Sequence, residues 1–414
     1  MKVVNVMYQT SFTKGQELVA QKLARELARR GCESYLVTSP YHDNEPIIDP
    51  RTLAKSVKGY IWSGEESKFG VPVIRVDGYV STWPPRRIMF RDFVSILRRL
   101  YEELEYDVII THSTLWNGPE DAAKFALWAK TLKSTGLLRK RIIFCHMSHY
   151  QPPDPLHYSI VEKSYRESWN RLVFPQIFRT ADLLLCTTPI EGDEMIRLGA
   201  RPEQIHIFPG GVDTEYMDNV KDMRRQLYER LQLEKDKKIV SYVGTVEKRK
   251  NPLAVVRTAK LLQEQNDIKF IIAGAPGNQH DDVIRESKGL KNIMYVGRLN
   301  DEEKVNLMRM SYLNIIMSRM EALGLTQLEF MYCGVPVVTS AVGGQRWVVR
   351  DGIDGLHVNG PDDYRGAADA VVRLVDDEGL REKMSINAHE RASKFSLNRL
   401  TEELIAKLEE LRGK

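Results

Sequence analysis

Two series of short apolar runs alternate with helix-like stretches, one series in each half of the chain. The strand-like runs of the first half are residues 2–8, 33–38, 107–113, 141–148 and 181–188. Those of the second half are residues 238–244, 268–274, 292–297, 312–318 and 335–340. Continuously apolar strands separated by helices predict parallel sheets covered on both faces, and right-handed crossovers make such sheets doubly wound. The expected fold class is α/β, with two Rossmann-like domains facing a ligand cleft.

The length of 414 residues also favours two hydrophobic cores over one. Between the two series lies FPGGVDTEYM, residues 208–217, where a proline and two glycines interrupt the pattern. We therefore expect an N-terminal domain over residues 1–209 and a C-terminal domain over residues 210–395. The last stretch looks helical throughout, and its final segment, residues 396–414, is expected to return to the first domain.

Composition excludes several broad classes of protein. Lysine and arginine total 60 against 56 acidic residues, a net charge of +4, which is too balanced for a general nucleic-acid binder. The four cysteines form no CxxC pair, so neither a disulfide framework nor a zinc site is expected. We find neither a signal peptide nor a run of about 18 apolar residues. These features predict a cytoplasmic protein, either soluble or peripheral at a membrane surface.

The segment SRMEALGLTQLEF, residues 318–330, follows an apolar run and places two glutamates on either side of a glycine-bearing turn. TQLE alone reads as a capping box, with Thr326 as the N-cap and Glu329 reaching back to its amide. Glu321 is not explained in this way. A helix that begins at the end of a buried strand presents free amides to a phosphate, here around Gly324, Leu325 and Thr326. The two carboxylates can accept hydrogen bonds from sugar hydroxyls.

EALGLTQLEFMYCGVPVV, residues 321–338, resembles the E-x7-E signature of the retaining glycosyltransferases of family 4, which have the GT-B fold. The resemblance is close over residues 205–358 and looser in the first half. It implies that Glu321 contacts the transferred sugar and Glu329 the ribose of a nucleotide-diphosphate sugar. It also implies an N-terminal acceptor-binding domain and a C-terminal donor-binding domain. The donor-binding residues that it implies are Gly15, Gly244, Arg249, Lys250, Ala322, Leu323, Gly324, Leu325, Thr326 and Glu329.

The basic segment GTVEKRKN, residues 244–251, lies between a predicted strand and a helix opened by Pro252. A basic run is usually a solvated surface. Cations at a strand end, however, can stabilise the charge that develops on a departing diphosphate. The resemblance assigns this role to Arg249 and Lys250, although Thr245 stands where a common form of the family has arginine.

Three histidines compete for a role near the end of a strand: His112, His146 and His149. The family keeps a histidine at this place to contact the donor sugar, and the resemblance favours His146. The HxxH spacing of His146 and His149 lacks a third ligand, so no metal site is expected. Gly15 is the one glycine left of the family's glycine-rich first loop. Trp347, after the glycine pair 343–344, replaces a glutamate that many relatives have.

Two segments are candidates for contacting an acceptor or a membrane. Residues 86–104 mix arginines with apolar residues at helical spacing, which fits either a membrane-surface helix or a packed surface helix. Residues 149–174 are rich in tyrosine and tryptophan, which stack on sugars but also fill cores. Neither segment identifies the acceptor, and no sequence feature indicates an oligomeric state.

The resemblance implies a retaining transferase that needs no metal or other cofactor and moves a hexose from a UDP- or GDP-sugar to an alcohol acceptor, forming an α-glycosidic bond. Sugar, glycan, lipid and small polyol acceptors all remain open. The catalytic residues expected are Glu321, His146, Arg249 and Lys250. The alternatives are a sugar-nucleotide epimerase of the same architecture and a binding protein without catalytic activity.

Overall fold

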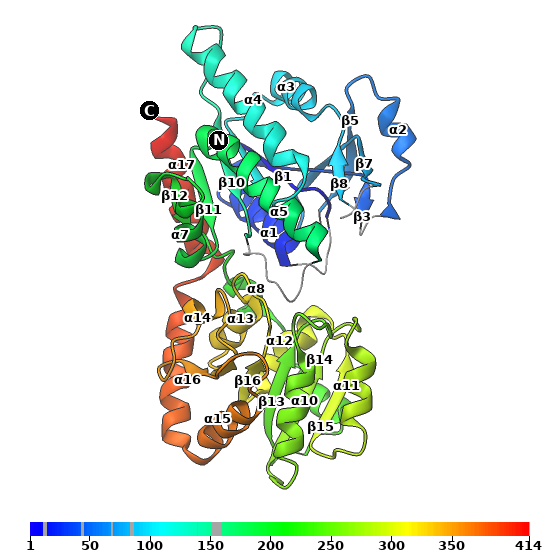
Figure 1. The fold of residues 1–414 in the computed structure, drawn as a ribbon, viewed down its shortest axis with the longest axis vertical. Coiled ribbons are helices and arrows are strands. Elements are labelled where there is room, and N and C mark those ends of the chain that lie inside the picture. The colour runs from blue at the N-terminus through cyan, green and yellow to red at the C-terminus, as the bar shows by residue number, and fades with distance from the viewer. Residues whose placement is uncertain are drawn as a thin grey trace. The chain divides into compact units, whose positions relative to one another are not determined.

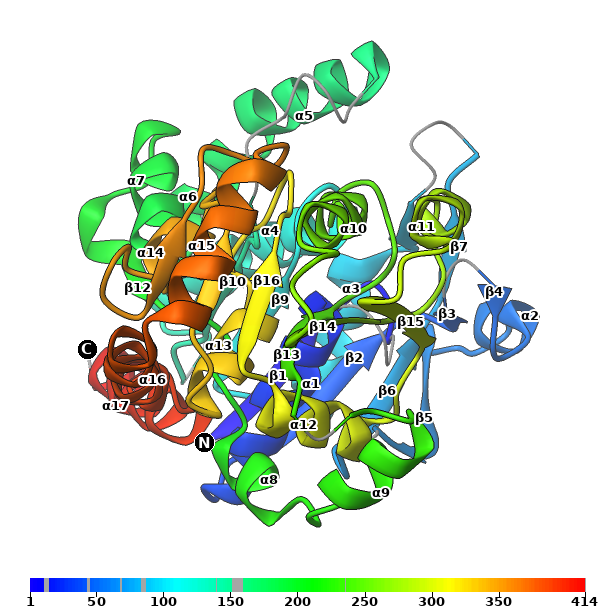
Figure 2. The same ribbon diagram turned by 90° about the horizontal axis from the view of Figure 1, so that it is seen from below.

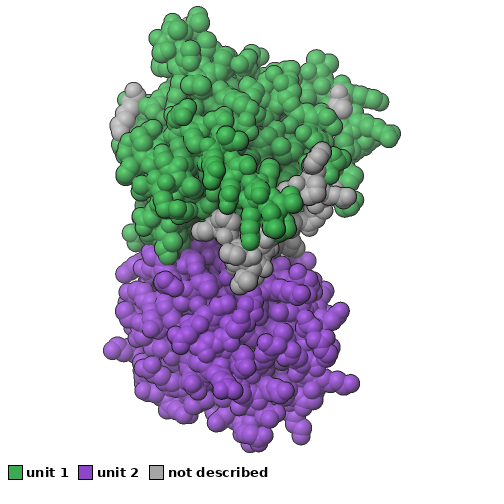
Figure 3. All heavy atoms as spheres, viewed as in Figure 1, with its two compact units in different colours: residues 1–210, 398–414 green, residues 211–397 purple. Residues whose placement is uncertain are grey.

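The computed structural model describes residues 1–10, 15–42, 45–67, 69–82, 87–138, 140–150, 159–234 and 236–413. The chain forms two compact units (Figure 3). Unit 1 comprises Met1–Gly210 and Asn398–Lys414, and unit 2 comprises Gly211–Leu397. The boundary between Gly210 and Gly211 falls in the Gly-rich segment where the periodicity of the sequence is interrupted.

Unit 1 is built on an eight-stranded sheet of order β12-β11-β10-β9-β1-β2-β6-β5 (Figure 1). Its strands are β1 Lys2–Val6, β2 Glu33–Thr38, β5 Tyr60–Glu66, β6 Pro72–Val76, β9 Val108–His112, β10 Ile143–Met147, β11 Leu183–Cys186 and β12 Ile205–Ile207. All neighbours are parallel except β5, which pairs antiparallel with β6 at the edge. Two short antiparallel pairs are added: β3 Tyr41–His42 with β4 Glu45–Pro46, and β7 Gly78–Val80 with β8 Ile88–Phe90.

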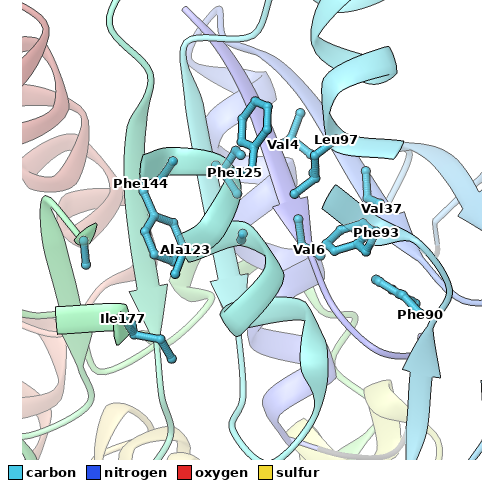
Figure 4. Packing of buried hydrophobic residues seen from close by; sticks show 14 of the residues in the cluster. Val4, Val6, Val37, Phe90, Phe93, Leu97, Ala123, Phe125, Phe144 and Ile177 are labelled. Atoms are coloured by element: carbon cyan, nitrogen blue, oxygen red, sulfur yellow. The ribbon is translucent and has the colours of Figure 1, made fainter. Parts of the chain in front are cut away.

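Helices cover both faces of this sheet. The helices of unit 1 are α1 Gly15–Arg29, α2 Pro50–Ala54, α3 Phe93–Leu104, α4 Asn117–Ser134, α5 Ile160–Leu172, α6 Phe174–Thr180, α7 Pro189–Arg197 and α17 Leu397–Arg412. Figure 4 shows the main core, where side chains of β1, β2, β8 and β10 meet those of α3, α4 and α6. On the opposite face, Ala24 of α1 packs against Leu36, Val71 and Val73. This layered arrangement explains why β1 is buried from Val3 to Val6 and β9 along its whole length.

Helix α17 begins at the last residue of unit 2 and continues in unit 1. Its leucines recur at helical spacing and are buried at positions 400, 404, 408 and 411. Arg412 pairs with Asp107 at 3.6 Å, and Glu402 accepts a hydrogen bond from Arg30 at 3.3 Å. The C-terminal helix is thus fixed to unit 1 by an apolar stripe and by charges on its flanks.

Unit 2 contains a six-stranded, wholly parallel sheet of order β15-β14-β13-β16-β17-β18. Its strands are β13 Lys238–Val243, β14 Ile268–Ala273, β15 Ile293–Gly297, β16 Leu313–Ile316, β17 Val337–Thr339 and β18 Gly355–His357. Its helices are α8 Thr214–Asn219, α9 Arg224–Arg230, α10 Pro252–Leu261, α11 His280–Ser287, α12 Asp301–Met310, α13 Leu325–Tyr332, α14 Gln345–Val348, α15 Tyr364–Asp376 and α16 Glu378–Ser393. Figure 2 shows α10 and α15 on one side of β13 and β16, with α12 on the other. The predicted α/β class with two doubly wound parallel sheets is confirmed.

The order of the strands reverses between β13 and β16, because β14 and β15 lie on one side of this pair and β17 and β18 on the other. Ligands of open α/β sheets bind at the carboxyl ends of the strands where such a reversal occurs. The segment after β13 is residues 244–251, and the segment after β16 is residues 317–324. Both segments that carry the predicted donor site therefore leave the sheet at the reversal point.

The basic stretch 86–104 is not one helix. Its first part forms strand β8, and α3 begins at Phe93. The apolar face of α3, including Phe93, Leu97 and Leu100, is buried in the core of unit 1, and Arg98 lies 4.4 Å over the ring of Trp128. The packed surface helix is thus the correct alternative, because this face has no apolar area left for a membrane. None of the helices in the described ranges has the length and apolar character that a membrane crossing requires.

Candidate functional site

Helix α13 begins at Leu325, and its N-cap is Gly324 in the left-handed region at φ 99°. The predicted capping box with Thr326 as N-cap is wrong, since Thr326 is already the second residue of the helix. Glycine fits this position because it has no Cβ to oppose a positive φ. It also offers no side chain to cap the first turn. The amides at this helix end therefore remain suited to an anion.

The turn before α13 packs directly on the glycine pair that follows β17. The Gly344 amide donates to the Glu321 carbonyl at 3.1 Å. A Cβ on Gly344 would lie 2.0 Å from the Ala322 carbonyl oxygen, and one on Gly343 would lie 2.2 Å from that of Glu321. Leu323 turns its side chain into the core and is 4% exposed. The backbone of residues 321–324 is thus held in place by direct contact with the backbone of Gly343 and Gly344.

Lys250 and Glu321 form an ion pair between the two segments at the reversal point. Lys250 Nζ donates to Glu321 Oε2, which Ser318 Oγ also approaches at 3.5 Å. The side chains are 21% and 11% exposed, so the pair is partly shielded from water. The Arg319 amide also donates to the Arg249 carbonyl at 2.8 Å. Two predicted site residues, 71 positions apart in the chain, are therefore in direct contact.

Arg249 takes a different partner from Lys250. Its Nη2 donates to Glu247 Oε1 at 2.7 Å, and its Nη1 lies 3.4 Å from the Met320 carbonyl oxygen. Arg249 thus lies beside the same segment as Lys250, with its guanidinium oriented by Glu247. Gly244, at the end of β13, packs so closely on Gly274 that a Cβ on the latter would lie 1.8 Å from the Gly244 carbonyl oxygen.

Glu329 lies in the second turn of α13. Its carboxylate accepts from Lys304 Nζ of α12 at 3.3 Å and 3.2 Å, one distance for each oxygen. This ion pair replaces the expected bond to the amide of residue 326. Lys304 was not predicted as a site residue, because the contact joins two helices 25 positions apart and no local motif indicates it.

Gly15 and His146 belong to unit 1. Gly15 is the first residue of α1, and a side chain at this position would meet no atom within 4 Å. Lys14 and the other residues between positions 10 and 15 lie outside the described residues. His146 lies inside β10, one residue before its end, and Nδ1 is 2.9 Å from Thr111 Oγ1. The remaining predicted residues, from Gly244 to Glu329, are all in unit 2.

All three competing histidines gather at the carboxyl ends of β9 and β10. The rings of His112 and His149 stack with centroids 6.3 Å apart. Burial lowers the pKa of His146 to about 3 and that of His149 to about 4, and it holds the pKa of His112 well below its usual value. The three rings are therefore neutral imidazoles at neutral pH. Among the described residues, no group of three metal-ligating side chains occurs.

Glu191, which was not predicted either, supports the segment that follows β10. Its buried carboxylate accepts from Ser148 Oγ, from the Tyr150 amide at 2.7 Å and from the Thr187 amide and hydroxyl at 2.7 Å and 2.6 Å. Thr188 caps α7, and its Oγ1 accepts from the Glu191 amide. The sequence TPIE at residues 188–191 matches a capping box, so Glu191 could have been recognised from the sequence as a glutamate in the first turn of a helix.

Trp347, where the resemblance leads one to expect a glutamate, packs within unit 2. Its ring meets Phe395 edge to face with centroids 5.0 Å apart, and Arg391 lies 5.4 Å over it. Arg391 also donates to the Trp347 carbonyl at 2.9 Å. This residue thus joins α14 to α16 through aromatic and cation–π contacts.

Two family models match the chain: "Glycosyltransferase Family 4" over residues 13–216 and "Glycosyl transferases group 1" over residues 223–391. A D-inositol 3-phosphate glycosyltransferase of Xylanimonas cellulosilytica is 26% identical over 395 residues, which cover 92% of this chain and 88% of the relative. A protein of the same name from Nocardiopsis dassonvillei is 29% identical over 245 residues, 56% of each chain.

Solved glycosyltransferase structures share the fold. The structure of Anabaena HepE with UDP and glucose has a TM-score of 0.69 at 17% identity and covers 99% of this chain and 100% of its own. A glycosyltransferase of Rickettsia africae has a TM-score of 0.72 at 15% identity and covers 99% of this chain and 98% of its own. Because the family models match both halves of the chain and these structures share its fold, this protein is a GT-B glycosyltransferase of family 4, a retaining family that uses nucleotide-sugar donors.

Proposed function

We propose that the protein transfers a hexose from a UDP- or GDP-sugar to an alcohol acceptor and forms an α-glycosidic bond. The observation that carries this proposal is the Lys250–Glu321 ion pair beside the free amino end of α13, at the reversal point of the unit 2 sheet. A cation, a carboxylate and a helix dipole together match the three parts of a sugar diphosphate: the phosphates, the sugar hydroxyls and the leaving oxygen.

In the reaction, the bond between the anomeric carbon and the diphosphate oxygen breaks, and its electron pair leaves with the diphosphate. Lys250, Arg249 and the first amides of α13, from Gly324 to Thr326, stabilise the charge that develops there. The acceptor oxygen bonds to the same carbon on the same face, and its proton passes to the departing phosphate. Glu321 orients the sugar through its hydroxyls, and no protein nucleophile is required.

For unit 1, we propose that His146 contacts the transferred sugar and that Gly15 contributes to donor binding. A neutral imidazole fits contact with a sugar, because it can donate or accept a hydrogen bond without opposing charge on the anomeric carbon. The acceptor is proposed to bind to unit 1 and the donor to unit 2. The names of the curated relatives, D-inositol 3-phosphate glycosyltransferases, make a cyclic polyol phosphate the first acceptor to test, beside sugars, glycans and lipids.

The test combines thermal unfolding with a transfer assay. The chain is heated with UDP- and GDP-linked hexoses, since a ligand bound only by the folded state raises the midpoint of unfolding. Transfer is then measured with the stabilising donor, for the natural chain and for Glu321→Ala. We expect the variant to lose transfer while its unfolding midpoint changes little. A fully active variant would exclude the proposed role of Glu321.

The epimerase alternative is separated by incubating the donor without any acceptor and analysing the sugar. Epimerised sugar nucleotide would support that alternative, whereas transfer only when an acceptor is added supports the proposal. A chain that binds a sugar nucleotide tightly but neither transfers nor epimerises the sugar would be a binding protein.

A further inference from the structure

Lys304 lies in the first turn of α12, just after the capping box that Asn300 and Glu303 form. Its ammonium group lies 3.2 Å and 3.3 Å from the two oxygens of Glu329, so it bridges the carboxylate almost symmetrically. A carboxylate has about four acceptor positions on its two oxygens. A single bridging donor leaves acceptor positions on both oxygens for other hydroxyl groups.

The surroundings of this pair are acidic. Burial lowers the pKa of Lys304, but the carboxylates of Glu329, Asp301 and Asp213 raise it further, so the net shift is upward and the side chain stays cationic at neutral pH. Burial together with Asp301, Glu302, Asp213 and Glu329 raises the pKa of Tyr216 to about 12. Several acceptor groups therefore gather around one ammonium group, as suits a ligand that is rich in hydroxyls.

The spacing along α13 fits a nucleotide. Glu329 is four residues after Leu325, about 6 Å along the axis at the usual rise of about 1.5 Å per residue. A diphosphate at the amino end of α13 would place the attached ribose within about one turn of that end. The backbone of Glu329 is likewise about one turn from the amino end of α13.

We propose that Lys304 is a positioning residue that holds the Glu329 carboxylate ready to accept hydrogen bonds from the ribose hydroxyls, and thereby makes the donor site specific for ribonucleotides. This inference rests on the proposed function. A glutamate held in one rotamer loses less conformational entropy on binding than a free one, so the ion pair adds affinity through preorganisation. Lys304 acts through Glu329, without a contact of its own to the ribose.

The experiment measures the affinity of the full chain for UDP and GDP and for their 2′-deoxy forms by calorimetry. For the natural chain, we expect the ribonucleotide to bind about tenfold more tightly than the deoxy form, the size of one charge-assisted hydrogen bond. Lys304→Met should reduce this ratio to about twofold by weakening the ribonucleotide alone. Lys407→Met, which removes a Lys–Glu pair of α17 in unit 1, should leave the ratio unchanged.

Glu329→Gln should lower the ratio to the same extent, and the double variant should lose no more than Glu329→Gln alone, because both residues act through one carboxylate. The double variant, Lys304→Met with Glu329→Gln, removes both charges of the ion pair. Because it leaves no unpaired buried charge, it shows whether a disturbed fold explains the effect of Lys304→Met alone. A ratio that Lys304→Met leaves at the natural value, or additive losses in the double variant, would overturn the inference. A natural chain that binds neither UDP nor GDP would overturn the proposed function together with it.

Discussion

Lys250 donates a hydrogen bond to Glu321 and so joins the segment after β13 to the segment after β16. The two charges neutralise one another where a diphosphate and a sugar are proposed to bind. A diphosphate carries more negative charge than one carboxylate, so it would compete with Glu321 for Lys250. The sugar hydroxyls would then donate hydrogen bonds to the Glu321 carboxylate. We therefore propose that this pair couples the recognition of the phosphate to the orientation of the sugar.

Replacing Lys250 should abolish most of the activity, whereas replacing the nearby Lys248 should have little effect. We expect Lys250→Met to lower kcat about 10²- to 10³-fold, the usual cost of one group that stabilises charge in a transition state. The matched control is Lys248→Met, since Lys248 is exposed in the same segment. Steady-state kinetics with the stabilising donor check both variants. Equal losses in the two variants would mean that only the general basicity of the segment matters.

The glycine pair after β17 should tolerate no side chain. In Gly344→Ala the new Cβ would lie 2.0 Å from the Ala322 carbonyl oxygen, so residues 321–324 must move. A displacement of about 1 Å can cost about a hundredfold in rate, and we expect a loss of that size in transfer. Gly379→Ala, in the first turn of α16, meets its nearest atom at 3.6 Å and should leave transfer unchanged. An active Gly344→Ala would show that the turn is not held by this contact.

The buried histidines of unit 1 should make the protein sensitive to acid. The folded-state pKa values of about 3 for His146 and about 4 for His149 lie below the unfolded value of about 6.5. The unfolded chain therefore binds more protons below pH 6.5, and the free energy of unfolding falls as the pH drops from about 6.5 towards 4. Each histidine contributes at most about 1.4 kcal/mol per pH unit.

Urea unfolding at pH 7 and pH 5 tests this dependence. His149→Asn should lose less stability between the two pH values than the natural chain, by about 2 kcal/mol. If His149→Asn retains the full difference, the histidine is already protonated in the folded protein.

Glu191 should contribute strongly to the stability of unit 1. Its carboxylate accepts hydrogen bonds from Ser148, Tyr150 and Thr187, so Glu191→Ala leaves several buried donors unsatisfied. We expect a loss of about 3 kcal/mol or more in the free energy of unfolding. Glu203→Ala, at an exposed glutamate, should change it by less than about 0.5 kcal/mol. Similar losses for the two variants would mean that water replaces the partners of Glu191.

The alternation of strands and helices could be predicted from the amino-acid pattern, because a buried parallel strand is mostly apolar and a helix is apolar on one face. A local boundary such as Pro252 at the start of α10 was also predicted from the sequence. Strands β3 to β8, β12 and β18 were not predicted. Strands β5, β12 and β18 lie at sheet edges, and β3, β4, β7 and β8 form short antiparallel pairs, so their partners decide their structure more than their own pattern does.

Which charged groups meet could not be predicted in this way, because it depends on how the chain folds. The E-x7-E motif indicated Glu321 and Glu329, but Lys250 reaches Glu321 across 71 positions and Lys304 reaches Glu329 across 25. The same holds for His112 and His149, which stack because β9 and β10 are neighbours in register. Such contacts depend on strand order and on the packing of helices. No periodicity within a short stretch of sequence carries that information, because the energy of an ion pair depends on distance in space and not along the chain.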